Sequence, residues 1–568
     1  KVLNLHIMKN LFEFRKIAVF LLGLVLVTGC DDQLSEINTN PYGIDPANAN
    51  PNLLMPSVLT SSAQSYLNLG FNDLAGAMQY TQKNGWYSSH NNYEWVSKSW
   101  TGWYDILRTN NLMITRGEEM DNAFFQGVGL TMKSFAFGNI ADLWGDAPYI
   151  NALKGDQGSD EFQFPKFDSQ EVIYDGIIAD LQEAATLLAS ASTEGVTAGN
   201  DLIYGADIDS WRRFTNSLLL RYYMRLSEKK PDVAKAGVEA IYSSGMYIQD
   251  PSQDATLDYT GGANDIWITR HVRLNPDDFQ RYQACQTFID QLTMTDDPRL
   301  PVFFDSVRVQ WVEDETLSVA AEDFIRANGE PIESIYTFDQ FEEEYADVKF
   351  TRHFNPNMAD YNSDLYVGLP PSILTPESYN GNPIPGQGTQ NLHVSQLDPI
   401  YSTAGSAGDI LQARIISAAE VSFIFAEGAL KGWSVGDAET HYNMGIEQSL
   451  QVWGKADMYE AFIAQPSVMF NSTLEQIITQ KWVANWSNGT EAFADYRRTG
   501  YPDLSAGPLS PQPEVAIRFQ YGNDEYNNNT DNINAALNNL EVTEFSGNFG
   551  ADSQWSKPWL YQGTNNPF

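Results

Sequence analysis

Apolar residues at helical spacing are the feature that most restricts how this chain can fold. In residues 174–188 the apolar side chains recur every three or four positions, which places them on one face of an α-helix. Asp168 or Ser169 could cap the start of this helix, because short polar side chains accept hydrogen bonds from the first free backbone N–H groups. The same spacing predicts further helices over residues 103–120, 127–143, 210–226 and 232–242. Helix pairs joined by short turns indicate a tetratricopeptide-like scaffold, although the chain has no strict repeat consensus.

The helical pattern stops in the middle of the chain. From about residue 249 to residue 406, Pro and Gly interrupt short strand-like pieces, for example residues 266–268 and 307–312. This change predicts an irregular, loop-rich second lobe. Helical spacing then returns over residues 411–431, 437–452 and 474–486.

The tail that follows Pro502 is rich in Asn, Pro and Gly. Aromatic residues are interleaved with these polar residues, which favours a long ordered loop that wraps the body over a disordered tail; they are Tyr521, Tyr526, Trp555, Trp559 and Tyr561. We therefore predict a mainly α-helical single body over residues 52–568, with a helical part (52–248), an irregular lobe (249–406), further helices (407–502) and a wrapping tail (503–568).

The first residues have the pattern of a processing signal. Basic Lys9, Arg15 and Lys16 precede an apolar run over residues 17–27, which is too short to span a bilayer. Val27-Thr28-Gly29-Cys30 then matches the bacterial lipobox, in which the cysteine is acylated. We predict a signal peptide over residues 1–29 and a lipid-anchored tether over residues 30–51. The alternative is that Cys30 is an ordinary thiol after a secretory signal.

The charge of the chain makes nucleic acid an unexpected partner. The sequence has 34 basic and 73 acidic residues, a formal net charge of −39, and a field of that sign repels phosphate backbones. Solubility of an exposed surface is the simpler account of this charge. Cys30 and Cys285 are the two cysteines, so acylation of Cys30 leaves no disulfide framework.

The sequence predicts neither catalysis, nor a metal, nor a cofactor. Residues 432–436, Gly-Trp-Ser-Val-Gly, satisfy the G-x-S-x-G pattern of serine hydrolases, but a helix rather than a strand is predicted before the serine. The two glycines fit an interhelix turn better. The six histidines are scattered and form no short zinc-binding spacing. Carboxylate pairs are inevitable among so many acidic residues and therefore indicate nothing about glycoside hydrolysis.

A cluster of aromatic residues over residues 82–104 is the best candidate for a binding site. Sugars present apolar C–H faces and hydroxyl rims, so they are bound by flat aromatic rings with polar side chains around them. Residues 84–92 have turn composition and could present rings to solvent. We predict as ligand-binding residues Trp86, Tyr87, Tyr93, Trp95, Asn91 and Asn92.

The alternative is that these aromatic side chains belong to the core. For Trp103 and Tyr104, which lie on a predicted helix, the core is expected. For Trp86, Tyr87 and Trp95 both interpretations stay open. Trp267 and the aromatic residues of the tail are further candidates.

Seven separated blocks of the chain are distinctive; they are WTGWYDILRTNN (100–111), ADLWGDAPY (141–149), WRRFTNSLLLRYYMRL (211–226), DDPRL (296–300), YVGLP (366–370), AAEVSFIFAEGALKGW (418–433) and QKWVANWSNGTEAFADYRRTGYP (480–502). In this order they resemble the SusD/RagB family of outer-membrane nutrient-binding lipoproteins of the Bacteroidetes type. The stretch Ile37 to Pro41 resembles the mature start of one branch of this family. Their order carries the resemblance, since each block alone is mostly packing and turn chemistry.

The resemblance implies a function and a partner. It implies a tetratricopeptide-like helical fold that cradles an irregular ligand-facing lobe and that covers a SusC-like TonB-dependent β-barrel transporter in the outer membrane. It implies binding of a nutrient such as an oligosaccharide, without catalysis or a cofactor. Asp31 and Asp32 fit the acidic residues that the family associates with display on the cell surface. A lipid-anchored glycoside hydrolase and a structural surface lipoprotein that binds no nutrient are the alternatives.

Overall fold

The computed structural model describes residues 48–260, 281–322, 325–327, 330–332, 348–382, 385, 391–401, 410–564 and 566–568. Residues 51–568 form one compact unit. The predicted signal peptide, Cys30, Asp31, Asp32, most of the tether, Trp267 and the strand-like piece at 266–268 lie outside the described residues. None of the described helices combines the length and the hydrophobicity needed to span a bilayer.

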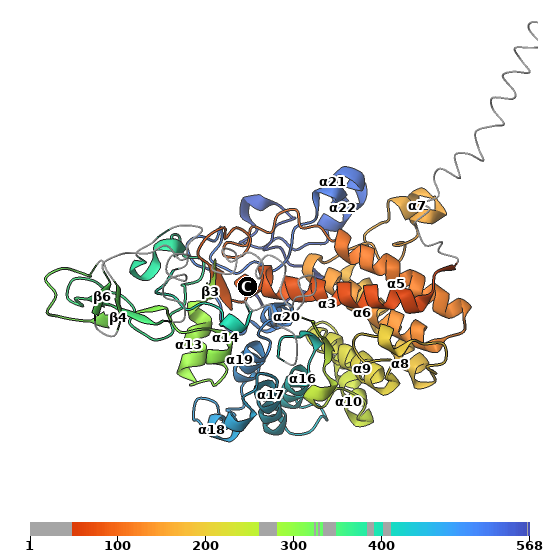
Figure 1. The fold of residues 1–568 in the computed structure, drawn as a ribbon. Helices are drawn as coiled ribbons and strands as arrows, with labels where there is room; N and C mark the ends of the chain where they lie inside the picture. Colours follow the sequence, from red (N-terminus) through yellow and green to blue (C-terminus); the bar gives the residue numbers. More distant parts are fainter. Residues whose placement is uncertain are drawn as a thin grey trace, which may run out of the picture. The chain divides into compact units, whose positions relative to one another are not determined.

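The first part of this unit consists of helices that pack on their neighbours in sequence (Figure 1). They are α3 (Pro51–Phe71), α4 (Asp73–Ala77), α5 (Thr101–Glu119), α6 (Ala123–Trp144), α7 (Asp160–Gln163), α8 (Gln170–Ala189), α9 (Ile208–Arg225) and α10 (Pro231–Ser244). The five helices predicted here are confirmed, with ends that differ by a few residues. The mainly helical, paired fold class is likewise confirmed.

The start of α8 shows which of the two predicted caps is used. Ser169 accepts a hydrogen bond from the backbone N–H of Val172, as an N-cap does. The carboxylate of Asp168 instead accepts from the backbone N–H groups of Tyr149 and Ile150, at 3.2 and 2.8 Å. Asp168 therefore fixes the preceding loop, and Ser169 begins the helix.

The prediction of one helix over residues 411–431 is wrong at its start. Residues Ala413–Ile416 form strand β8, which pairs antiparallel with β2 (Ala255–Leu257), and helix α16 (Ala418–Leu430) begins after the N-cap Ser417. The strand exists because β2, far away in the sequence, supplies hydrogen-bond partners. Periodicity alone carries no information about such a partner.

A second group of helices, α16 to α19, lies at the bottom of Figure 1, beside α9 and α10. α16 packs against α17 (Ala438–Val452) and α19 (Leu474–Ala484), around buried Phe423, Tyr442 and Ile477. The short α18 (Tyr459–Ile463) lies between them in sequence, and α20 (Gly489–Thr499) follows. The two later helices predicted from periodicity, over residues 437–452 and 474–486, are confirmed.

The irregular lobe consists mainly of short strands and loops. β4 (Val309–Glu313) runs parallel to β7 (Phe350–Phe354), and β5 (Ile325–Ala327) and β6 (Glu330–Ile332) complete a sheet of order β4-β7-β5-β6. β1 (Thr81–Lys83) pairs antiparallel with β3 (Tyr282–Ala284) and so joins the helical part to this lobe. Two short helices that the sequence did not predict, α13 (Gln286–Met294) and α14 (Leu300–Phe303), follow β3.

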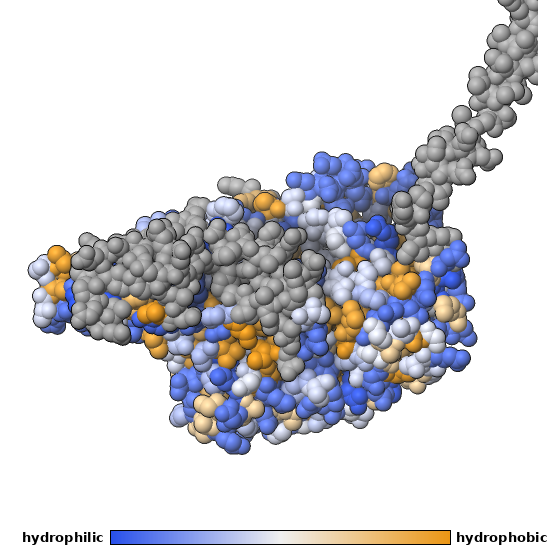
Figure 2. All heavy atoms as spheres, in the orientation of Figure 1, coloured by the Kyte–Doolittle hydropathy of each residue, from blue (hydrophilic) through white to orange (hydrophobic). Residues whose placement is uncertain are grey.

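The C-terminal tail is docked on the helices. It contains the short helices α21 (Asn523–Asn528) and α22 (Thr530–Leu537), and hydrophilic residues dominate the surface over them (Figure 2). Arg518 is fully buried and donates to the backbone O of Trp144 at 3.2 Å and to Asp552 at 2.7 Å. Trp555 is also fully buried, so the tail contributes to the core.

Buried ion pairs join the two groups of helices. Arg225 of α9 bonds to Asp142 of α6 at 2.7 Å and to Glu491 of α20 at 2.6 Å. Arg221, one turn earlier on α9, bonds to Glu420 of α16 at 2.7 Å and to Glu491 at 3.1 Å. Burial alone would raise the pKa of Glu491, but the charges of Arg221 and Arg225 hold it below the usual value. We refer to these five residues as the buried charge cluster.

We expect Glu491→Gln to lower the free energy of unfolding by about 3–5 kcal/mol, because it leaves two buried guanidinium groups without their shared counter-charge. Urea denaturation followed by circular dichroism measures this change. Asp105→Asn is the matched control, since Asp105 pairs with Arg108 on the exposed face of α5 and should cost about 1 kcal/mol or less. Equal costs for the two variants would contradict a joining role for the cluster.

Candidate ligand-binding site

The predicted site begins with a loop, residues 84–97, which follows β1 and which we call the aromatic loop. Buried Asn91 closes it: its side-chain amide donates to the backbone O of Lys83 and accepts from the N–H of Lys83, both at 2.8 Å. Asn92, also buried, accepts from the N–H of Ser89 at 2.9 Å. The two asparagines thus hold the loop through hydrogen bonds to the backbone of Lys83 and Ser89.

Two aromatic side chains fix the same loop to the core. Trp95 is fully buried and meets Phe493 and Phe519 edge to face, with ring centroids 5.8 and 5.0 Å apart. Its indole N–H donates to the backbone O of Ser89 at 2.8 Å. Tyr93 is fully buried beside it, with 5.8 Å between the ring centroids.

The structure places the six predicted ligand-binding residues in two groups, four that are buried and two that are more exposed. Asn91, Asn92, Tyr93 and Trp95 have their side chains inside the protein, where they hold the loop. Trp103 is buried, as expected for a core residue, and Tyr104 is half-buried. Of the tail aromatics, Tyr521, Trp555 and Tyr561 are buried, and Tyr526 and Trp559 are half-buried. We therefore keep the proposal of an aromatic platform for Trp86 and Tyr87.

Trp86 is the exposed ring of the loop, with 67% of its surface accessible, and Tyr87 is half-buried. The guanidinium of Arg281 lies over the Trp86 ring at 4.3 Å from its centroid. Arg281 is brought there by the β1–β3 pairing, which continues as Asn84 donates from its backbone N–H to the O of Arg281 at 3.0 Å. A cation over one face supports the indole and leaves most of the ring available to a ligand.

The backbone of the loop has an unusual conformation. Trp86, Ser89, Tyr93 and Ser97 all have positive φ angles between 48° and 69°, a region that non-glycine residues rarely adopt. Such conformations persist when the surroundings dictate them, and they concentrate at ligand sites. Contact with α4 is part of this constraint, because a Cβ at Gly76 would lie 2.0 Å from the backbone O of His90. The loop is therefore shaped before a ligand arrives.

A polar cavity of about 670 Å³ lies in the irregular lobe. Its lining combines tyrosine rings with amide, hydroxyl and carboxylate groups; the lining includes Asp360, Tyr361, Asn362, Thr375, Ser378, Tyr379 and Asn380. This volume is within the range of about 300–1,000 Å³ that is usual for ligand clefts.

One wall of this cavity is fixed by stacked rings. Tyr361 stacks on Trp311 at 4.4 Å and 11°, and His393 also stacks on Trp311, at 4.4 Å and 9°. The Trp311 indole N–H donates to the backbone O of Asn380 at 2.7 Å. Burial and the charge of Arg352 lower the pKa of His393 to about 3, so its imidazole is neutral and packs as an apolar ring.

The cavity and the aromatic loop are connected by Ser372. Its backbone N–H donates to the side chain of Gln82 at 2.9 Å, and its hydroxyl donates to the backbone O of Asn91. The next residue, Ile373, lines the cavity. The wall of the cavity is thus anchored to the loop that presents Trp86, and we treat the two together as the candidate site.

Sequence reasoning missed the residues that the irregular lobe contributes, including Arg281 and the cavity tyrosines. A signal was present, since Asp360-Tyr361-Asn362 and Ser378-Tyr379-Asn380 each place an aromatic residue between polar ones, as the aromatic loop does. These short segments lack any period, so they did not stand out from the surrounding loops.

The Gly-Trp-Ser-Val-Gly segment is an interhelix turn, as predicted. It lies between α16 and α17, and Gly432 and Gly436 have φ angles of +79° and +93°. The backbone N–H of Ser434 donates to Glu239 of α10 at 2.7 Å. Helix α16 directly precedes this segment, whereas the nucleophile of a serine hydrolase follows a strand. Within the described segments, no group of three His, Cys, Asp or Glu side chains is placed to hold a metal ion.

Comparisons with known proteins agree on one fold. A sequence profile of the SusD-like family, described as starch-binding and associating with the outer membrane, matches residues 45–320 and 376–522. A SusD homologue from Bacteroides fragilis gives a TM-score of 0.68 at 20% identity, over 90% of this chain and 100% of the other. A chitin-binding protein gives 0.66 at 22% identity, with the same coverage.

A third solved structure, a chitin-binding SusD homologue from Flavobacterium johnsoniae, gives a TM-score of 0.64 at 18% identity, over 90% of this chain and 99% of the other. At these identities the structural likenesses establish the fold. The search of curated proteins finds no match.

We expect Trp95→Ala to lower the free energy of unfolding by about 3–5 kcal/mol, because it removes a fully buried ring. Trp86→Ala should cost about 1 kcal/mol or less, since the exposed ring loses little beyond its contact with Arg281. Chemical denaturation followed by circular dichroism compares the two variants. Similar costs would mean that Trp86 is also a structural residue.

Proposed function

The chain belongs to the SusD-like family of outer-membrane nutrient-binding proteins, and from this premise we propose that it captures a glycan at the cell surface and delivers it to a SusC-like TonB-dependent transporter. The family is one of binding proteins rather than enzymes. The observation that carries the proposal is the exposed Trp86 ring on a loop that four buried residues hold in shape; they are Asn91, Asn92, Tyr93 and Trp95.

The chemistry of the candidate site supports a glycan ligand. The apolar C–H face of a sugar ring can stack on the exposed indole, which is 67% accessible. The hydroxyl groups of neighbouring sugar units can bond to the tyrosine, serine, threonine and carboxylate groups of the adjacent cavity. A loop that needs no reordering to bind loses little entropy, which favours affinity.

The rival function, a lipid-anchored glycoside hydrolase, lacks support at this site. Glycoside hydrolysis generally uses two carboxyl groups that flank the bond to be cleaved. Of the described residues that line the cavity, Asp360 alone carries a carboxyl group. Glu420 and Glu491 of the buried charge cluster are ion-paired with Arg221 and Arg225 inside the body.

The proposed location rests on the start of the chain. Acylation of Cys30 would anchor the protein, because the methylene groups of the acyl chains are buried in the membrane. Residues 30–51 would form the tether. Asp31 and Asp32 support display on the outer face. The net charge of −39 gives no reason to expect nucleic acid as a partner.

The first test is binding to a panel of glycans by calorimetry. For the glycan that the wild type binds, we expect Trp86→Ala to weaken binding by about 1–3 kcal/mol at unchanged stability, by analogy with bases stacked on aromatic rings. Phe549→Ala is the control, because Phe549 is an exposed aromatic residue of the tail. Appearance of shorter products would favour the hydrolase, and absence of binding to every glycan would favour a structural protein.

The second test concerns the anchor and the partner. We expect the wild type to fractionate with the outer membrane and Cys30→Ala to be released, as judged by immunoblotting. Cys285→Ala should stay at the membrane, because Cys285 is a buried thiol of the body. Gentle detergent extraction of the wild type should also recover a large β-barrel protein, and recovery of the chain alone would contradict the transporter partnership.

A further inference from the structure

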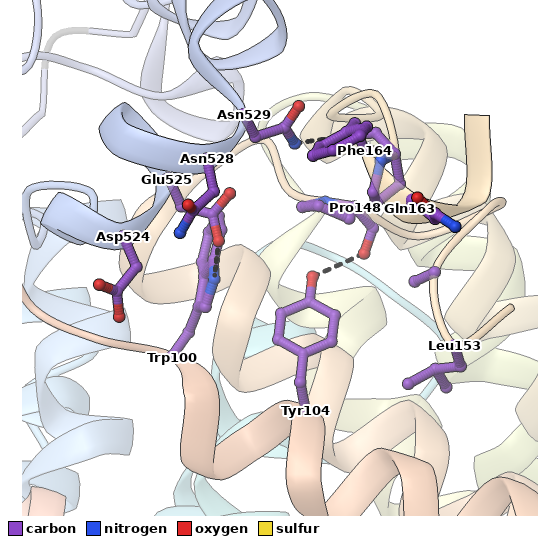
Figure 3. A pocket seen from close by; sticks show the side chains of 12 residues that line it. Trp100, Tyr104, Pro148, Leu153, Gln163, Phe164, Asp524, Glu525, Asn528 and Asn529 are labelled. Carbon is purple, nitrogen blue, oxygen red and sulfur yellow. Dashed lines mark hydrogen bonds between the residues drawn. The ribbon is translucent and has the colours of Figure 1, made fainter. Parts of the chain in front are cut away.

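A second, smaller pocket lies where the C-terminal tail covers the start of α5 (Figure 3). Its volume is about 240 Å³, equal to roughly eight water molecules at liquid density, which suits a small molecule. It shares no lining residue with the candidate site described above. In Figure 3, Trp100 and Tyr104 rise from the start of α5, and Glu525 and Asn528 approach from α21 on the opposite side.

Hydrogen bonds fix the three segments that form the pocket. The Trp100 indole N–H donates to Glu525 at 3.0 Å, which joins α5 to α21. The Tyr104 hydroxyl donates to the backbone O of Pro148 at 2.6 Å, and the Asn529 amide donates to the backbone O of Pro165 at 2.9 Å. The pocket is therefore built into the fold.

The charges of the pocket are acidic. Asp524 and Glu525 contribute carboxylates, and Gln163, Asn528 and Asn529 contribute amides. No lysine, arginine or histidine is among the described residues that line it. Burial raises the pKa of Glu525, and the neighbouring charge of Asp524 raises it further. A ligand with a positive charge would compensate these carboxylates, and an anion would be repelled.

Three aromatic side chains and several aliphatic groups contribute to the walls of the pocket. Trp100, Tyr104 and Phe164 line it together with the apolar groups of Pro148 and Leu153. Aromatic faces attract cations, and several rings around a carboxylate are the usual setting for recognition of organic ammonium groups. A metal ion would need several carboxylates at coordinating distance, and the apolar walls do not favour one.

We propose that this pocket binds a small organic cation, with its ammonium group held by the aromatic rings and by the carboxylates of Asp524 and Glu525. The rings also accommodate the carbon skeleton of the ligand. The proposal is independent of the glycan site, because it rests on different residues and on a different chemistry.

The experiment is calorimetric titration of the full chain with two matched pairs of ligands. Choline is compared with its neutral analogue, in which carbon replaces nitrogen, and glucosamine is compared with glucose at a pH below the amine pKa. We expect the charged member of at least one pair to bind about tenfold or more tightly than its neutral partner. Equal binding within both pairs, or no binding of either cation, overturns the proposal.

Variants test whether binding occurs in this pocket. Glu525→Gln keeps an acceptor for the Trp100 indole and removes the charge, and it should weaken cation binding about tenfold or more. Phe164→Ala should weaken it as well, and it should fold normally because 47% of the side chain is exposed. Asp531→Asn, an exposed acidic residue of α22 outside the pocket, is the control and should leave binding unchanged.

Trp86→Ala tests this proposal independently of the proposed function. It should leave cation binding unchanged while it weakens glycan binding. If Glu525→Gln and Phe164→Ala both bind the cation as tightly as the wild type, the pocket is not the site and the proposal is overturned, whatever the result with glycans.

Discussion

The buried charge cluster is the interaction on which the rest of the structure depends. Removing charged groups from water is costly, so they are tolerated in the interior only when each has partners at close range and fixed orientation. Here Arg221 and Arg225 of α9 meet carboxylates from α6, α16 and α20. Because those helices come from both ends of the chain, the cluster permits essentially one arrangement of the two helical groups.

Helix α20 connects the buried charge cluster to the candidate site. Its Glu491 belongs to the cluster, and Phe493, on the same helix, packs against Trp95 of the aromatic loop. Arg497, one turn further, donates to the backbone O of Ile517 at 3.1 Å and so holds the tail. The ion pairs of Glu491 and the ring contact of Phe493 thus connect the buried charge cluster to Trp95 in the loop that presents Trp86.

The sequence predicts what is periodic and local. It is sufficient for most of the helices and for the glycine turn between α16 and α17, because each depends on residues within a few positions. It leaves Asp168 and Ser169 as alternative caps of α8, and the structure decides between them. The sequence does not show that Trp86 is exposed while Trp95 is buried, since both are tryptophans in the same polar loop. Their difference depends on Phe493 and Phe519, about four hundred residues later, and strand β8 depends likewise on β2. The residues of the candidate site are thus set by long-range partners that no local pattern contains.

The distribution of charge connects the two pockets with the composition of the chain. Among the described residues, the buried charges balance, with ten acidic side chains and ten basic ones. The net charge of −39 therefore belongs to the remaining residues, and its field extends about one Debye length, roughly 8 Å at physiological salt. A neutral glycan is indifferent to this field, so its recognition depends on ring stacking and hydrogen bonds at the aromatic loop. A cation is attracted by the field, and the acidic pocket beside α21 adds to that attraction a cation–π contact that an anion or a neutral molecule cannot use. The proposed glycan and the proposed cation therefore bind through different interactions at different places, and we expect no competition between them.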